Sequence, residues 1–302
     1  MPKHNIKFIP YSANSDIIDC VMKFDFHTHC FPDSLAQRAL KQLSDRNPKK
    51  PRPHYDGTFG GLKARLNKAG IGGSVVCNIS TNPKQTPAVN SFAIACAESK
   101  NNPQADFPQI NKRTQHFGSI HPSYENYKYE IDRLCGAGIK GLKFHPDYQG
   151  NFVDDESVFP IYEYAAGKGM IMLFHTGLDI GLRGVVKSTP DRFINVVNAF
   201  RGAKLVAAHM GGYKYADVTE EYLTGKDCYM DTSASLTTLT KKQAERMIKN
   251  HGVDKILFAT DLPWFSPEKD IKFIDSLNLT VEEKEKIYYR NAEKLLGVKF
   301  DG

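Results

Sequence analysis

Short apolar runs alternate with longer amphipathic segments from residue 22 to the end of the chain. Eight apolar runs predict strands, at 23–27, 73–79, 116–120, 139–145, 170–175, 203–209, 228–233 and 255–260. Several are apolar almost throughout, which is typical of parallel strands buried on both faces. Amphipathic segments predict helices between them, for example at 34–45, 124–138, 157–169, 191–200 and 241–250. Gly138, Gly169 and Gly202 each stand where a predicted helix should stop before the next strand.

Eight strands that each precede a helix indicate an α/β fold, a TIM-type (β/α)8 barrel in a single domain. The runner-up, a doubly wound sheet, needs a glycine-rich phosphate loop after the first strand, but this chain has HTHCFPDS there. We predict that the barrel spans 22–302. Residues 1–21 are interpreted as an N-terminal extension outside it, and 100–115 as an exposed loop with two prolines.

Composition narrows the classes of partner. The 302 residues carry a formal net charge of +6 that is mostly dispersed, which is not the footprint of a nucleic-acid-binding protein. No apolar run approaches the roughly 18 residues of a membrane span, and no secretory signal is recognised. The six cysteines are scattered, as reduced thiols would be. We therefore expect a cytoplasmic protein with a small-molecule substrate and neither a nucleic-acid nor a membrane partner; a homodimer is left open.

Metal-competent side chains stand at the ends of several predicted strands. Residues i and i+2 of a strand point the same way, so His27 and His29 should both face the barrel axis. His175 and Asp261 arrive at the ends of two other strands. Because the carboxyl ends of barrel strands meet at one mouth, these nitrogen and oxygen ligands predict one divalent metal ion. Zn²⁺ is the expected ion, with Mn²⁺ or Co²⁺ as alternatives.

The ordered motifs resemble the amidohydrolase superfamily, in particular the amidohydrolase-related branch that includes aminocarboxymuconate semialdehyde decarboxylase-like enzymes. They are FDFHTHCFPD, GLKFHP, LFHTG, AAHMGG, FATDLPW and the tail YYRNAEKLLG, which together cover 22–297. The resemblance implies that His27, His29, His175 and Asp261 bind the metal. It also implies that His209, after the sixth strand, is a catalytic histidine.

Lys143 and His145 share one face of the fourth strand. In binuclear relatives a carbamylated lysine there bridges two metals, but GLKFHP favours a mononuclear site in which Lys143 and His145 contact the substrate. TatD-like nucleases resemble this pattern less, because they carry a glutamate on that strand. Arg183 is interpreted as a clamp for a substrate anion, since guanidinium matches carboxylate geometry.

Two reactions are compatible with such a site. The first is hydrolysis of a small anionic lactone or amide by a metal-activated water, with Asp261 transferring the proton and His209 stabilising the oxyanion. The second is non-oxidative decarboxylation of a small unsaturated or aromatic carboxylic acid, a carboxy-lyase reaction. The sequence favours the hydrolase slightly. A purely structural metal is the least favoured alternative, because the site is expected at an open barrel mouth.

Overall fold

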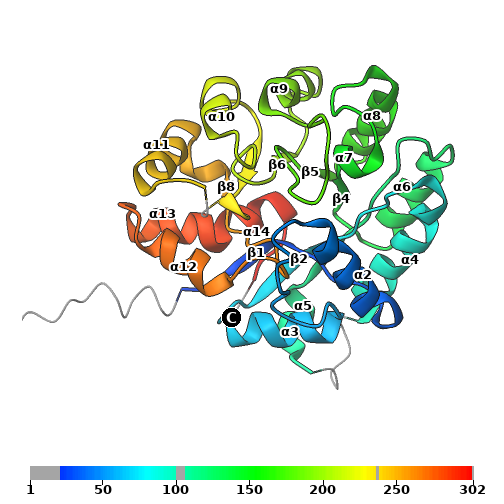
Figure 1. Ribbon diagram of the computed structural model, residues 1–302, viewed down its shortest axis with the longest axis horizontal. Helices are drawn as coiled ribbons and strands as arrows, with labels where there is room; N and C mark the ends of the chain where they lie inside the picture. The colour runs from blue at the N-terminus through cyan, green and yellow to red at the C-terminus, as the bar shows by residue number, and fades with distance from the viewer. Residues whose placement is uncertain (1–20, 100–105, 236–237, 301–302) are drawn as a thin grey trace, which may run out of the picture.

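Eight short parallel strands form the centre of the structure, a computed structural model that describes residues 21–99, 106–235 and 238–300 (Figure 1). They are β1 (Phe24–Thr28), β2 (Gly73–Cys77), β3 (Gln115–Phe117), β4 (Gly141–Phe144), β5 (Ile171–Phe174), β6 (Leu205–Ala207), β7 (Tyr229–Asp231) and β8 (Ile256–Leu257). The ladders run β1-β2-β3 and β4-β5-β6-β7-β8. Parallel bridges between Gly118 and Leu142 and between Thr28 and Leu262 join the two groups. The predicted (β/α)8 barrel is therefore confirmed.

Helices surround the strands (Figure 1). The α-helices are α2 (Asp33–Arg46), α3 (Phe59–Lys68), α4 (Thr86–Glu98), α5 (Pro108–Arg113), α6 (Tyr127–Gly136), α7 (Pro146–Gln149), α8 (Phe159–Gly167), α9 (Pro190–Ala199), α10 (Ala216–Tyr222), α11 (Lys241–His251), α12 (Pro267–Asp275), α13 (Val281–Glu285) and α14 (Asn291–Leu296). A π-helical turn, Lys286–Arg290, links the last two. Within the described ranges, none of these helices has the length and apolar character that crossing a bilayer requires.

The strands are apolar because they are covered on both sides. All four residues of β4 and all four of β5 are buried, and a barrel strand has one face toward the barrel interior and one toward the helices. The predicted helix stops are also observed. Gly138, Gly169 and Gly202 adopt φ of 76°, 69° and 80°, a left-handed conformation that glycine enters without a Cβ clash and that ends a helix.

Two predictions about the backbone differ from the structure. The strands are shorter than predicted. For the predicted strand 139–145, the observed strand β4 spans only Gly141–Phe144, and for 203–209 the observed strand β6 spans only Leu205–Ala207. The segment 100–115 is not simply an exposed loop: α5 lies within it, Ile110 is 5% exposed, and its side chain joins the hydrophobic core. Residues 100–105, and residues 1–20 of the predicted extension, lie outside the described part of the chain.

Candidate metal centre

The polar residues singled out by the sequence stand at or just beyond the carboxyl ends of the strands. His27 and Lys143 lie within β1 and β4, and the others follow their strands closely: His29 after β1, His145 after β4, His175 after β5, His209 after β6 and Asp261 after β8. Three of the imidazole rings contact one another across the barrel. The ring centroids are 5.3 Å apart for His27 and His209, and 4.8 Å apart for His175 and His209. The parallel topology therefore brings them to one mouth, as expected.

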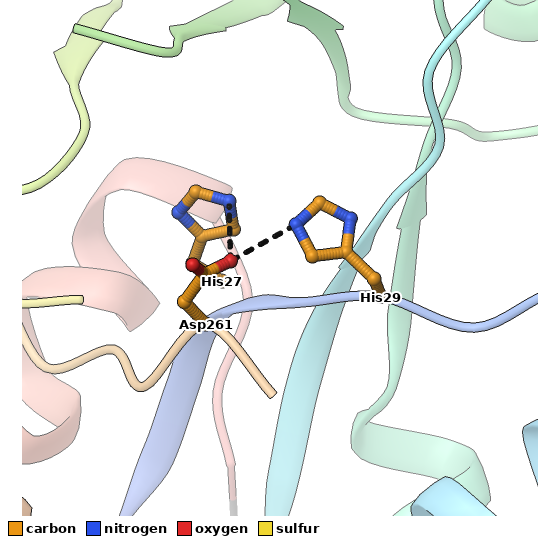
Figure 2. Close-up of side chains that lie close together, drawn as sticks. All are labelled: His27, His29 and Asp261. Carbon is orange, nitrogen blue, oxygen red and sulfur yellow. Dashed lines mark hydrogen bonds and ion pairs between the residues drawn. The ribbon is translucent and has the colours of Figure 1, made fainter. Parts of the chain in front are cut away.

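His27, His29 and Asp261 form the centre of the site. Figure 2 shows the two imidazoles facing one carboxylate oxygen: His29 Nε2 is 3.2 Å and His27 Nε2 is 3.7 Å from Asp261 Oδ1. One ligand atom from each residue lies within 4.8 Å of the other two. Two nitrogens and one oxygen are the donor chemistry that suits a divalent transition metal.

Three buried imidazoles of this region, those of His27, His175 and His209, are held in the neutral form. Burial lowers the pKa of His27 to about 3, with the nearby Lys143 charge as a second cause. Burial also lowers the pKa of His209 and, more strongly, that of His175. A neutral imidazole keeps one lone pair, which is the form that binds a metal ion.

Hydrogen-bond partners determine which ring nitrogen keeps that lone pair. His27 Nδ1 lies 2.9 Å from Asp231 Oδ2, and His29 Nδ1 lies 2.8 Å from the Cys77 carbonyl oxygen. An ionised carboxylate and a carbonyl only accept, so each Nδ1 carries the proton. Nε2 of each ring faces Asp261 Oδ1, and His29 Nε2 can donate a hydrogen bond to this oxygen in the metal-free protein. Metal ligands bind in their deprotonated forms and release protons on binding, so two Nε2 atoms beside one carboxylate fit a divalent metal ion.

His175 carries a free lone pair by the same logic but lies outside that group of three. His209 Nδ1 donates to the Ser233 carbonyl at 3.1 Å, so its Nε2 accepts from His175 Nδ1 at 3.0 Å. The remaining atom, His175 Nε2, is buried and has no hydrogen-bond partner among the described residues. A ring nitrogen of His175 instead lies within 4.8 Å of potential ligand atoms of His145 and Asp179. His175 is therefore available as a ligand, although the predicted set of four does not close into one cluster.

Lys143 is part of the site rather than of the surface. Its side chain is 1% exposed, and Nζ lies 3.1 Å from His27 Nε2, where it can donate to that lone pair. Burial lowers the pKa of Lys143. A lysine in this position can provide a positive charge when a substrate anion enters and lose it otherwise.

Asp231 is a site residue for which the sequence predicted no role. It is fully buried at the end of β7. Besides His27 Nδ1, its carboxylate accepts from the backbone N–H groups of His209 and Ser233, both at 3.0 Å, and from the Ser233 hydroxyl. Burial alone raises its pKa, but the His27 partner and these donors outweigh burial and lower the pKa. Its position at a strand end was the available signal.

A second buried carboxylate, Asp25, connects β1 with the chain after β8. It accepts from His27 N at 3.1 Å, from Thr260 N at 3.0 Å and from Thr260 Oγ1 at 2.5 Å. Burial raises the pKa of Asp25 to about 7 in spite of these donors. This carboxylate fixes the spacing between the strand that carries His27 and the segment that carries Asp261.

Two site residues have unusual backbone conformations. His209 and Asp261 adopt φ of 60° and 66°, a region that costs a non-glycine residue roughly 1 kcal/mol or more. Backbone bonds hold both in place: His209 N donates to Asp231 Oδ1 at 3.0 Å and Asp261 N to the His27 carbonyl at 2.9 Å. The barrel thus imposes a conformation that these residues would not adopt alone.

Arg183 is not brought into the site. It is exposed in the loop after β5, and it forms no hydrogen bond or ion pair with the metal-competent residues described above. Its predicted role as an anion clamp stays a prediction. In the same loop, Asp179 reaches His145, with 3.2 Å between its Oδ2 and His145 Nε2. No pattern in the sequence marked Asp179.

Solved structures resemble this barrel over almost its full length. The 5-carboxyvanillate decarboxylase of Sphingomonas paucimobilis is 14% identical, with a TM-score of 0.67, and the match covers 92% of this chain and 100% of that one. A dihydroxybenzoic acid decarboxylase of Polaromonas, with bound manganese and 2-nitroresorcinol, is 14% identical with a TM-score of 0.64 and coverage of 92% and 97%. A Staphylococcus aureus protein described as a putative amidohydrolase is 20% identical with a TM-score of 0.63 and coverage of 92% and 100%.

At such identities the structural similarity establishes the fold alone. No curated protein sequence matches this chain. A family model does: the one described as Amidohydrolase matches residues 24–298, from β1 to just beyond α14. That interval contains every strand of the barrel and all the residues of the candidate metal centre. The chain therefore belongs to the amidohydrolase family.

Proposed function

We propose that this protein is a metal-dependent, non-oxidative decarboxylase of a small aromatic or unsaturated carboxylic acid. The observation that carries the proposal is the convergence of His27 Nε2 and His29 Nε2 on Asp261 Oδ1, beside the buried Lys143 amine. The sequence had favoured hydrolysis slightly. The structural neighbours favour the alternative, because their descriptions name aromatic-acid decarboxylases.

His27, His29 and Asp261 would hold the metal ion, with His175 as a further nitrogen ligand. Each imidazole offers Nε2 because Nδ1 is already bonded to Asp231, to the Cys77 carbonyl or to His209. When bound, the ion would supply a Lewis acid that binds and polarises substrate oxygen atoms. Manganese is named with two of the neighbouring decarboxylases, so we take Mn²⁺ in place of the Zn²⁺ favoured by the sequence.

The charges of the site suit an anionic substrate. Lys143 is the buried cation beside His27 Nε2, and a carboxylate that approaches it favours its protonated form. Asp261 is the carboxylate nearest the imidazoles. Burial would raise its pKa, but the hydrogen bond from His29 and the neighbouring histidines outweigh burial and lower it. Asp261 is therefore ionised and can accept a proton.

The reaction needs one carbon–carbon bond to break and one carbon–hydrogen bond to form. The electron pair of the bond to the carboxylate stays on the substrate carbon, CO₂ departs, and the carbon takes up a proton. Asp261 is the group that we assign to this transfer: it takes a proton from a substrate hydroxyl or from water and passes it to the carbon. His209, whose ring contacts both His27 and His175, shapes the pocket and orients these rings.

The test is a substrate panel on protein purified without chelator and loaded with Mn²⁺. Hydroxybenzoates and unsaturated carboxylic acids are assayed for CO₂ release, and lactones and amides for hydrolysis. We expect CO₂ release with one solvent deuterium in each product molecule formed in D₂O. Asp261→Asn should reduce turnover by about 10³-fold or more, as removal of a proton-transfer group does. Asp254→Asn, whose side chain is 59% exposed, is the control. Hydrolysis of a lactone or amide without CO₂ release would instead identify the hydrolase.

A further inference from the structure

Beside the group of three lies a second cluster, in which only His175 has a role in the function proposed above, as a further nitrogen ligand. It consists of His145 after β4 and of His175 and Asp179 after β5, and their ligand atoms lie within 4.8 Å of one another. The His145 and His175 rings are stacked, with centroids 4.0 Å apart and planes within 8°. His145 is 5% exposed and His175 is 7% exposed. Burying two polar imidazoles beside a carboxylate carries a desolvation cost, so we asked which function this arrangement could serve.

The cluster is poorly arranged to be a metal site of its own. Both nitrogens of His145 have partners: Nδ1 accepts from the Tyr148 backbone N–H at 3.4 Å, and Nε2 donates to Asp179 Oδ2, 3.2 Å away. A lone pair lies in the plane of its ring. Two rings that are parallel and stacked direct their lone pairs side by side, not toward one point, so His145 and His175 do not converge on a common ion.

The arrangement does restrict the orientation of the His175 ring. His209 accepts from its Nδ1 at 3.0 Å, which fixes one edge. The parallel His145 ring covers one face, so rotation of His175 would require His145 to move. Asp179 fixes His145 in turn, and Asp179 is itself held by its own loop, because its Oδ1 accepts from the Gly181 N–H at 2.7 Å.

We propose that Asp179, acting through His145, is a positioning residue that holds the His175 ring so that its Nε2 is available to the bound divalent ion. This inference uses the metal-binding part of the proposed function and none of its reaction chemistry. It assigns a role to the buried Nε2 that has no partner. It also gives His145 a structural task in place of the substrate contact predicted from the sequence.

The experiment measures Mn²⁺ affinity by competition with a chelating indicator, without substrate. Asp179→Asn should weaken binding about 10-fold and His145→Ala up to about 100-fold, the range typical when residues that orient ligands are removed. His145→Phe keeps a flat ring over His175, so it should lose less affinity than His145→Ala. Within the His145→Phe background, Asp179→Asn should have no further effect, because Asp179 acts through the hydrogen bond to His145.

Asp147→Asn is the matched control. Asp147 lies in α7, and its Oδ1 accepts from the Lys187 N–H at 3.0 Å, so it also ties the loop after β5 to the chain after β4. Its side chain forms no hydrogen bond with the His145 ring. We expect unchanged Mn²⁺ affinity in this variant. Far-UV circular dichroism and urea unfolding of the metal-free variants show whether each one is folded.

A spectroscopic measurement separates positioning from general destabilisation. In Co²⁺-loaded protein, Asp179→Asn should shift the visible absorption bands while the urea midpoint of the metal-free protein stays close to that of the wild type. Wild-type Mn²⁺ affinity and an unchanged Co²⁺ spectrum in Asp179→Asn would overturn the proposal. The proposal would also be overturned if the wild type bound two equivalents of metal and Asp179→Asn bound only one, because the cluster would then be a metal site itself. Failure of the wild type to release CO₂ would leave these outcomes unaffected and would count only against the decarboxylase.

Discussion

Replacing Asp231 by Asn should affect both the stability of the metal-free protein and its affinity for metal. The carboxylate is fully buried and accepts from His27 Nδ1 at 2.9 Å and from the N–H groups of His209 and Ser233 at 3.0 Å. Asparagine has a single acceptor oxygen, so at least one of these donors loses its partner. Leaving a buried donor without a partner typically costs about 1–3 kcal/mol, and we expect a loss in that range.

Metal affinity should fall because the Asp231 carboxylate holds the His27 proton on Nδ1. Without it His27 can adopt the other tautomer, in which Nε2 is protonated and cannot bind a metal. Loss of such a carboxylate partner typically weakens metal binding about 10- to 100-fold. Urea unfolding of the metal-free protein and Mn²⁺ competition measure the two effects. The control is Asp254→Asn, since the exposed Asp254–Lys286 pair should contribute less than about 1 kcal/mol. A variant at Asp231 that matched this control in both assays would refute the reasoning.

Two further predictions concern metal removal and pH. A chelator should lower the unfolding midpoint and Mn²⁺ should restore it, since a ligand at about 100 times its Kd stabilises the folded state by about 2.7 kcal/mol; no change on chelation would contradict a metal bound by the folded chain. For the metal-free protein, the pKa of His27 is lowered from 6.5 to about 3, so its contribution to stability is lost as pH falls through that window. The pKa of Asp25 is raised from 3.8 to about 7, so its contribution is lost as pH rises from 3.8 through 7. Asp25→Asn removes this opposing effect, and the urea midpoint of the variant should fall more steeply on acidification than that of the wild type; parallel pH profiles would show the assignment to be wrong.

The barrel and the position of its mouth were predictable because they depend on regular geometry. Strand parity places His27 and His29 on one face, and the shared direction of parallel strands brings their carboxyl ends together wherever the helices between them end. For the same reason Asp261, far away in sequence, could be expected beside them, and the structure places it 3.2 Å from His29 Nε2.

The residues around the predicted metal ligands could not be predicted from the period of hydrophobic and polar residues. Asp179 reaches His145 from a loop whose course is set by backbone hydrogen bonds. Arg183, four residues later, is exposed, and its contact with a substrate anion stays a prediction. The segment 100–115 was predicted to be a loop, but it contains α5, whose Ile110 side chain is buried.

The amino-acid pattern by itself therefore determined the architecture and the set of side chains that reach the mouth, because strand period and parallel direction leave few alternatives. Only the tertiary structure decided which nitrogen of each imidazole stays free and where His175 lies relative to the other ligands. Those features depend on contacts between residues far apart in the chain, such as His27 with Asp231 and His209 with His175. A single ring rotation changes them without any change in the order of hydrophobic and polar residues.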